Sequence, residues 1–260
     1  MDDHDVARCW DDNAETWAND VRKGYDTYRD LFHNPAFLAF VGELTGREVL
    51  DLGCGEGYTT RLFAAQGARV TGVDISAEMI RLARAAEQER PLGISYEVAS
   101  ASDLSRFAEA HFDAVLSTMA MMDLPDYPGA VGAVARVLKR GGVFAFSINH
   151  PCLGYGRVRF EQSADEVRPV VIGEYFSEEP TVETWRFRGT PAGTPGRPYT
   201  VPRFPRPLSA YLNPLAEHGL HLVALEEPRP NEETCQKEPR LRKWQRLPAF
   251  LFVKAVKRVP

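Results

Sequence analysis

The groups best suited to binding chemistry stand close together in the run Val49–Gly57, which reads VLDLGCGEG. Its three glycines, Gly53, Gly55 and Gly57, allow a ligand to approach the backbone closely. An apolar run precedes them and a helix-like pattern follows, so they lie where a strand ends and a helix begins. Open α/β sheets bind their ligands at this position. The acid Asp51 beside the loop suits a ligand that carries an ammonium group.

A second acid follows at an informative distance along the chain. Asp74 ends the next apolar run, Val70–Asp74, 21 residues after Gly53. A carboxylate at the end of a second strand can accept hydrogen bonds from both hydroxyl groups of a ribose. A nicotinamide dinucleotide site would have a third glycine where Tyr58 stands, and Glu56 adds negative charge where a pyrophosphate would bind. The loop therefore disfavours an anionic dinucleotide.

The elements that must position these residues alternate between residues 35 and 150. Short apolar runs and helix-like segments follow one another there, a pattern that predicts a doubly wound, mostly parallel α/β sheet of the Rossmann-like class. The expected strands are Glu48–Leu52, Arg69–Val73, Ser95–Val98, Phe112–Ser117 and Val143–Ile148. The expected helices are Tyr58–Gln66, Ala77–Glu89 with Ser76 as its N-cap, and Ala130–Leu138, stopped by Gly141 and Gly142.

The segment from Asn149 to Pro205 departs from this alternation. It holds 8 of the 19 prolines, and a regular doubly wound layer cannot continue through them. Within it we expect an antiparallel ribbon between Tyr175–Phe176 and Val182–Phe187. The sheet then resumes with a helix over Leu208–His218 and strands over Leu220–Leu225 and Ala249–Val256.

This organisation predicts four parts in the chain. They are an N-terminal helical cap (1–34) that acts as a lid, an α/β core that binds the cofactor (35–149), an insertion that covers the acceptor (150–205), and the rest of the core (206–260).

Composition excludes several classes of function. The 260 residues are 44% hydrophobic and 26% charged, with a formal charge of -5, which argues against a dedicated nucleic-acid binder. No apolar run approaches the ~20 residues that span a bilayer, and the acidic start lacks the features of a signal peptide. We therefore expect a cytoplasmic monomer or homodimer that does not bind membranes. The cysteines Cys9, Cys54, Cys152 and Cys235 form no CxxC pair, so neither a disulfide framework nor a metal site is expected.

The run VLDLGCGEG, with Asp74 at the end of the next strand, resembles motif I and the acidic loop of the class I S-adenosylmethionine-dependent methyltransferases that act on small molecules. The resemblance covers about residues 45–150 closely. It implies that Asp74 holds the ribose of the cofactor and that Ile75 packs on the adenine. It also implies contacts to the methionine part of the cofactor from Asp51, Gly53, Gly55 and Gly57.

Other stretches fit the same resemblance. The turn Val98–Leu104 looks like the adenine-binding turn of the family, in which the amide of Ala101 meets the ring edge. Ser100 stands where the family usually has Asp, and Ser102 or Asp103 could replace that contact. By resemblance the backbone near Ser117 faces the methionine end of the cofactor.

The N-terminal part holds a further candidate. In glycine N-methyltransferase and similar enzymes an arginine about twenty residues before motif I binds the cofactor carboxylate, and Arg29 stands 20 residues before Val49. An arginine can clamp a carboxylate with two parallel hydrogen bonds. On the same resemblance Trp17 and Tyr25 close over the cofactor, although aromatic residues at helical spacing are also typical of packing.

Methyl transfer from a sulfonium requires in-line placement of a nucleophile, and a base if the nucleophile carries a proton. His150, directly after the strand Val143–Ile148, is the first candidate for this base, and Asp123, after Phe112–Ser117, is the second. Met122, Tyr155 and Tyr175 are the candidate acceptor-binding residues.

The sequence thus predicts an enzyme that moves a methyl group from S-adenosyl-L-methionine to O, N or C of a small-molecule metabolite, of the kind found in secondary metabolism. The product of the cofactor is S-adenosyl-L-homocysteine, and no metal is expected. Two alternatives remain: an NAD-dependent oxidoreductase, and a methyltransferase-fold protein that binds the cofactor without catalysis.

Overall fold

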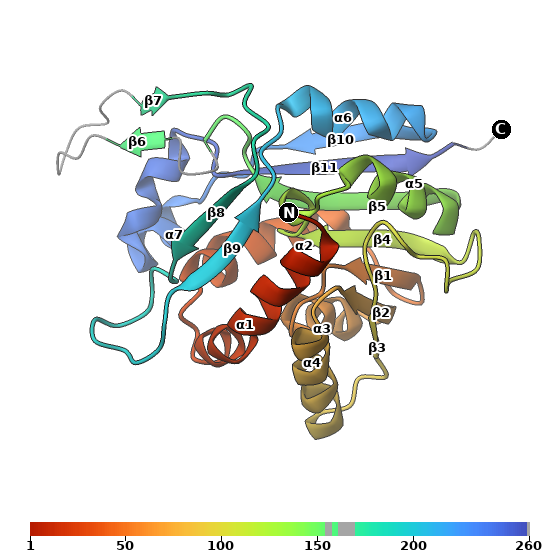
Figure 1. Ribbon diagram of the computed structural model, residues 1–260, viewed down its shortest axis with the longest axis horizontal. Helices are drawn as coiled ribbons and strands as arrows, with labels where there is room; N and C mark the ends of the chain where they lie inside the picture. The colour runs from red at the N-terminus through yellow and green to blue at the C-terminus, as the bar shows by residue number, and fades with distance from the viewer. Residues whose placement is uncertain (154–157, 161–169, 259–260) are drawn as a thin grey trace.

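The computed structural model describes residues 1–153, 158–160 and 170–258. Its centre is a seven-stranded sheet in the order β10-β11-β5-β4-β1-β2-β3 (Figure 1). Strands β1 to β5 run parallel to one another, and β11 runs antiparallel to both β5 and β10. The strands are β1 Glu48–Leu52, β2 Arg69–Asp74, β3 Ser95–Val98, β4 Phe112–Thr118, β5 Leu138–Asn149, β10 Leu220–Glu226 and β11 Phe250–Lys257. The predicted mostly parallel α/β class is confirmed.

Helices cover both faces of this sheet. One face packs against α5 and α6, whose Val131 and Tyr211 lie in one apolar cluster. The other packs against α2, α3 and α4 through Phe37, Phe63 and Ile80. These helices are α2 Asn34–Val41, α3 Tyr58–Ala65, α4 Ala77–Glu89, α5 Tyr127–Val137 and α6 Leu208–Glu217. The shorter elements are the π-helix η1 Arg29–His33, the 3-10 helices η2 Met121–Asp123 and η3 Pro239–Gln245, and α7 Glu232–Lys237.

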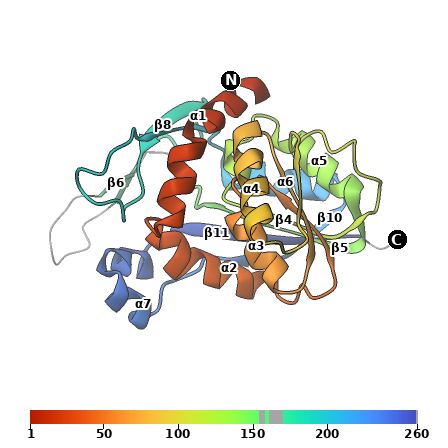
Figure 2. The same ribbon diagram turned by 90° about the horizontal axis from the view of Figure 1, so that it is seen from below.

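The N-terminal helix α1, Asp3–Arg22, crosses the carboxyl end of the sheet beside α4 (Figure 2). It begins at a capping box in which Asp2 and Asp5 exchange side-chain and backbone hydrogen bonds, which satisfies two free N–H groups of the first turn. Its small residues Ala14 and Ala18 pack against Met79 of α4. The helix therefore covers the ends of the strands, where the glycine loop lies.

A two-stranded ribbon packs against α1, and the helix and the ribbon together form the cover over the carboxyl end of the sheet. Strand β8, Thr181–Trp185, pairs antiparallel with β9, Tyr199–Arg203. Asn13 of α1 exchanges two hydrogen bonds, of 2.8 and 3.1 Å, with the backbone of Thr200 in β9. A second small ribbon pairs β6, Val158–Phe160, with β7, Val170–Ile172.

Two predictions of local structure are wrong. Tyr175 and Phe176 do not pair with Val182–Phe187, because they form a turn and the Tyr175 hydroxyl accepts a hydrogen bond of 2.9 Å from the N–H of Leu208. Gly141 and Gly142 do not stop a helix: α5 already ends at Val137, and the glycine pair lies inside β5. A Cβ atom on Gly142 would lie 2.8 Å from the carbonyl oxygen of Lys139, so this glycine serves a tight bend of the strand.

Across the described ranges, no helix combines the length and the apolar character needed to cross a membrane.

Candidate functional site

The carboxyl ends of β1, β2 and β4, together with α1 and the β8–β9 ribbon, enclose a cavity of about 910 Å³. Many of the residues singled out in the sequence line it: Trp17, Arg29, Asp51, Gly53, Gly55, Asp74, Ile75, Ser100, Ala101, Met122 and Asp123. Others do not line it, namely Tyr25, Gly57, Ser102, Ser117, His150 and Tyr175. Tyr155 lies outside the described residues.

The glycine loop is threaded between the ends of β2 and β4. The N–H groups of Gly53 and Cys54 both donate to the carbonyl oxygen of Val73, at 2.8 and 2.9 Å. Gly53 has a φ of 74°, and a Cβ atom there would lie 2.3 Å from the Cβ of Ala120. Gly57 is needed for another reason, because a Cβ there would lie 2.5 Å from the hydroxyl of Tyr96. Gly57 therefore serves packing, and it does not line the cavity, where the sequence analysis expected it to contact the ligand.

Replacing Gly53 by alanine should destabilise the fold by about 2–5 kcal/mol, since the substitution combines overpacking with a left-handed backbone. Gly55→Ala is the matched control: Gly55 also has a positive φ, of 55°, but no atom lies within 4 Å of its added Cβ. Urea unfolding of both variants measures the difference. Equal losses of stability in the two variants would mean that the close approach of Gly53 to Ala120 is absent in solution.

Two carboxyl groups face the cavity from the ends of β1 and β2, Asp51 buried and Asp74 half-buried. Oδ2 of Asp51 accepts a hydrogen bond of 2.6 Å from the Thr60 hydroxyl, and burial raises the pKa of Asp51 to about 7. The two oxygens of Asp74 accept hydrogen bonds of 2.9 Å from the N–H groups of Gly55 and Ser76. Burial also raises the pKa of Asp74. Each carboxylate oxygen keeps a further lone pair for a ligand.

Arg29 opens the π-helix η1 and places its guanidinium carbon 3.9 Å from the centre of the Tyr58 ring. Its Nε lies 3.1 Å from Oδ1 of Asp30 and 3.7 Å from Oδ2 of Asp26. Burial raises the pKa of Asp26 to about 6, against the opposing effect of the Arg29 charge. π-Helical turns are frequent at functional sites, and this one brings Arg29 to the cavity wall.

Five buried polar atoms on residues of the cavity wall have no hydrogen-bond partner within the described part of the chain. They are Nη2 of Arg29, Oδ1 of Asp51, Oε1 of Glu56, Oγ1 of Thr118 and Nε of Arg186. Because burial of an unsatisfied polar atom is costly, such atoms call for a partner that a bound molecule would supply. Glu56 and Thr118 were not among the residues predicted from the sequence to bind a ligand.

Neither Ser117 nor Ser102 itself lines the cavity, although a neighbour of each, Thr118 and Ala101, does. Ser117 is fully buried and donates its hydroxyl to the carbonyl oxygen of Leu52, at 2.7 Å, while the next residue, Thr118, lines the cavity. Ser102 donates its N–H to Oγ of Ser100, so it supports the turn while Ser100 faces the cavity. The hydroxyl of Ser100 in turn donates to Asp3 of α1, at 2.6 Å.

The β8–β9 ribbon contributes a buried ion cluster to the opposite wall. Arg203 pairs with Asp123 through Nη1 and with Glu183 through Nε, the latter at 3.1 Å. Asp123 and Arg203 are only 4% and 5% exposed, and burial raises the pKa of Asp123 to about 6. Trp185 and Phe187 of the same segment line the cavity beside Trp17. Asp123 thus faces the cavity in a fixed orientation.

His150 is held away from this cavity. Its Nε2 lies 2.9 Å from Oε1 of Glu227, and its Nδ1 accepts a hydrogen bond of 3.3 Å from the N–H of Cys152. Burial lowers the pKa of His150, which favours the neutral ring with both nitrogens engaged. His150 therefore does not line the cavity, where its position after β5 predicted it.

Tyr25 and Tyr175 do not line the cavity either, and both make contacts within the cover. The backbone carbonyl of Tyr25 accepts a hydrogen bond of 3.1 Å from Gly189, and its ring lies in the aromatic cluster between α1 and the ribbon. Tyr175 caps Leu208, as described above. Both tyrosines hold the cover together, so neither is a candidate ligand contact.

A histidine that the sequence analysis missed lines the cavity at the end of η1. Nε2 of His33 lies 2.9 Å from Oγ of Ser147, and Nδ1 lies 3.1 Å from Oδ1 of Asn34. Burial lowers the pKa of His33 to about 4, so the ring is neutral. Oγ of Ser147 also accepts the N–H of Met119, which has a φ of 58°. His33 thus connects η1 to the turn after β4, and no spacing in the sequence signals this contact.

The lining of the cavity carries an excess of acid. Its carboxyl groups belong to Asp3, Asp26, Asp51, Glu56, Asp74, Asp123 and Glu183. Its guanidinium groups belong to Arg29, Arg186, Arg188 and Arg203. Seven carboxyl groups against four cations favour a ligand with net positive charge. The described ranges contain no group of three or more His, Cys, Asp or Glu residues placed to hold a metal ion.

Comparisons with known proteins agree with this geometry. A family model described as a methyltransferase domain matches residues 50–146. The ubiquinone biosynthesis O-methyltransferase of Alkalilimnicola ehrlichii is 36% identical over 149 residues, which are 56% of this chain and 59% of that protein. Its counterpart in Thiobacillus denitrificans is 33% identical over 153 residues, 57% of this chain and 61% of that protein. The chain therefore spans about three fifths of the length of these curated relatives.

One solved structure matches nearly the whole fold. It is an S-adenosylmethionine-dependent methyltransferase from Mesorhizobium loti, 29% identical, with a TM-score of 0.70. The match covers 85% of this chain and 96% of that one.

Proposed function

Because the chain belongs to the class I S-adenosylmethionine-dependent methyltransferases, we propose that it transfers the methyl group of S-adenosylmethionine to an oxygen of a small hydroxylated molecule. The observation that carries the proposal is the wall of one cavity, where a threaded glycine loop, Asp51 with an unpartnered oxygen, and Asp74 come together. The choice of oxygen follows the O-methyltransferase activity in the names of the curated relatives.

The residues present fit this cofactor in charge and in hydrogen bonding. Asp74 would hold the ribose hydroxyls, Asp51 the ammonium group, and the unpartnered Nη2 of Arg29 the carboxylate. Ile75 and the turn at Ala101 would enclose the adenine. S-Adenosylmethionine has a net positive charge and matches the acidic lining, whereas the pyrophosphate of NAD would meet repulsion. An NAD-dependent oxidoreductase is therefore not favoured.

The acceptor would lie against Met122 and the aromatic wall of Trp185 and Phe187. The bound cofactor supplies a methyl group on a positively charged sulfur. The sulfur becomes a neutral thioether when the methyl group is transferred. Asp123 accepts the proton of the acceptor hydroxyl as the new O–C bond forms. Arg203 holds that carboxylate in place, and the cover excludes water from the reacting atoms.

Incubation with methyl-labelled S-adenosylmethionine and a panel of hydroxylated aromatic compounds tests this function. We expect a labelled methyl ether and one equivalent of S-adenosylhomocysteine for each turnover. A protein that binds S-adenosylmethionine but methylates none of the panel, nor matched amines, would instead be a non-catalytic cofactor binder.

Cofactor affinity should depend on pH through Asp51. Below about pH 7 its carboxyl group is protonated in the unliganded protein, so it offers no charge to an ammonium group. We expect the affinity for S-adenosylhomocysteine to rise about 10- to 100-fold from pH 5 to pH 8 and then to level off. Calorimetric titration at each pH measures this dependence.

Two controls isolate this contribution, because Asp26, Glu56, Asp74 and Asp123 also have raised pKa values. Asp51→Asn should remove most of the slope. Binding of 5′-methylthioadenosine, which lacks the ammonium group, should depend less on pH than binding of S-adenosylhomocysteine. A slope that persists in the Asp51→Asn variant would assign the titration to another group.

A further inference from the structure

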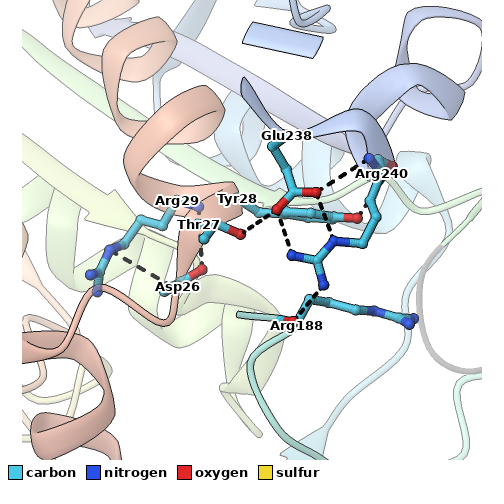
Figure 3. Close-up of polar contacts among 7 residues, drawn as sticks. All are labelled: Asp26, Thr27, Tyr28, Arg29, Arg188, Glu238 and Arg240. Atoms are coloured by element: carbon cyan, nitrogen blue, oxygen red, sulfur yellow. Dashed lines mark hydrogen bonds and ion pairs between the residues drawn. The ribbon is translucent and has the colours of Figure 1, made fainter. Parts of the chain in front are cut away.

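Three segments that are far apart in the sequence meet at Glu238 and Arg240 (Figure 3). They are residues 25–29 before and within η1, Arg188 after the ribbon strand β8, and the 238–240 stretch, which follows α7 and begins η3. The sequence analysis gave no role to the last of these. Thr27, Tyr28, Arg29 and Arg188 all line the cavity, whereas Glu238 and Arg240 do not.

Glu238 is the centre of this junction. It is 7% exposed, and its Oε1 accepts hydrogen bonds from the N–H and the Nε–H of Arg240, at 3.2 and 2.7 Å. Its Oε2 accepts Nη2 of Arg240 and, at 3.3 Å, the hydroxyl of Thr27. The paired guanidinium keeps the pKa of Glu238 below its usual range, so the carboxylate stays ionised.

Arg240 extends the junction to the other two segments. Its Nη1 donates to the carbonyl oxygen of Arg188, and its own carbonyl oxygen accepts the hydroxyl of Tyr28 at 3.3 Å. The N–H of Gly189 also donates to the carbonyl oxygen of Tyr25, at 3.1 Å. The ion pair therefore ties the loop before η1 to the ribbon and to the C-terminal part of the chain.

The same loop carries Arg29. Oδ1 of Asp26 accepts the N–H of Arg29 at 3.2 Å, and Figure 3 shows the Arg29 side chain extending from this turn on the side away from Arg240. At the far end of η1, His33 is anchored to Ser147. Residues 26–33 are thus held at both ends, with the unpartnered Nη2 of Arg29 between the two anchors.

We propose that Glu238 and Arg240 are positioning residues that hold Arg29 ready for the carboxylate of the cofactor, without touching the cofactor themselves. This inference rests on the proposed function, in which Arg29 binds that carboxylate. A loop fixed in its binding conformation loses less conformational freedom when the ligand arrives, which raises affinity. The benefit applies only to a ligand that uses Arg29.

Two ligands separate this role from a general structural one. S-Adenosylhomocysteine carries the amino-acid carboxylate, and 5′-methylthioadenosine shares its nucleoside and thioether but lacks that group. For Glu238→Gln, calorimetry should give about 3- to 10-fold weaker binding of S-adenosylhomocysteine, which is the change in affinity expected from the loss of one or two hydrogen bonds. Binding of 5′-methylthioadenosine should change less than about twofold.

Thr27→Val is the milder variant, because it removes only the hydroxyl that Glu238 accepts. It should act in the same direction, about two- to threefold, and it keeps the test decisive if Glu238→Gln unfolds the protein. Glu233→Ala is the matched control: this acid lies in the adjacent α7, is exposed, and pairs with Lys237 at 2.7 Å. It should leave the binding of both ligands unchanged.

An Arg29→Ala background completes the experiment. If Glu238 acts through Arg29, then adding Glu238→Gln to Arg29→Ala should cause little further loss of affinity for S-adenosylhomocysteine. Equal weakening of both ligands, or an undiminished effect in the Arg29→Ala background, would overturn the positioning role. If the unmodified, folded protein does not bind S-adenosylhomocysteine, the proposed function fails first, a result distinct from either of these.

Discussion

Replacing Asp74 by alanine should weaken the binding of S-adenosylhomocysteine about 10²- to 10⁴-fold. The carboxylate would accept both ribose hydroxyls, and each charge-assisted hydrogen bond contributes about 1.5–3 kcal/mol. The substitution also removes the partner of the Gly55 N–H, which the Asp74 carboxylate accepts at 2.9 Å, so the glycine loop loses support. Isothermal calorimetry of the purified variant measures the loss.

Asp103→Ala provides the matched control, since this acid lies near the adenine turn but is exposed and outside the cavity lining. The Asp103→Ala variant should bind S-adenosylhomocysteine with the same affinity as the unmodified protein. Asp74→Asn should fall between the two, because an amide keeps one acceptor oxygen but loses the charge. An Asp74→Ala variant that binds the ligand normally would remove Asp74 from the site.

Replacing Asp123 by alanine should lower the free energy of unfolding by about 3 kcal/mol. The substitution leaves the buried guanidinium of Arg203 without its closest partner, and breaking a buried ion pair in this way typically costs about 3–5 kcal/mol. We expect the lower end of that range, because Glu183 still pairs with Nε of Arg203. Urea unfolding followed by circular dichroism measures the change.

A double variant tests the cause of this loss. Asp123→Leu combined with Arg203→Met removes both charges, and such apolar replacement of a buried pair is often neutral. The double variant should therefore be more stable than Asp123→Ala, although it should have lost methyl transfer along with the proposed base. If the two variants are equally unstable, the loss comes from packing of the ribbon and not from the unpaired charge.

The local pattern of the sequence predicts the core well. The predicted strands Glu48–Leu52 and Ser95–Val98 have the observed bounds, and Ser76 caps α4 by accepting the N–H of Met79. These features depend on neighbours within a few residues, so spacing alone reveals them. The glycine loop is also local, which explains why Gly53 and Asp74 could be found together.

The cover of the cavity could not be predicted in the same way. Arg203 meets Asp123 across 80 residues, and His33 meets Ser147 across 114. Pairs of this kind depend on how separate segments pack, and no periodicity encodes them. The π-helical turn of η1, which sets the places of both Arg29 and His33, has no composition signal either.

His150 illustrates the limit of arguments from strand ends. Its position directly after β5 predicted a place at the mouth of the cavity, and the backbone is indeed at that edge of the sheet. The His150 side chain is held away from the cavity by Glu227, which follows β10 and contacts Nε2. Asp123, in contrast, is directed into the cavity by Arg203 from the ribbon.

Calorimetric titration of the unmodified protein with S-adenosylmethionine, and in parallel with NAD, tests the central claim most directly. We expect one equivalent of S-adenosylmethionine to bind, no binding of NAD, and weaker binding of 5′-methylthioadenosine than of S-adenosylhomocysteine. Binding of NAD by a folded protein that ignores S-adenosylmethionine would contradict the assignment of the glycine loop, of Asp51 and of Asp74 to this cofactor.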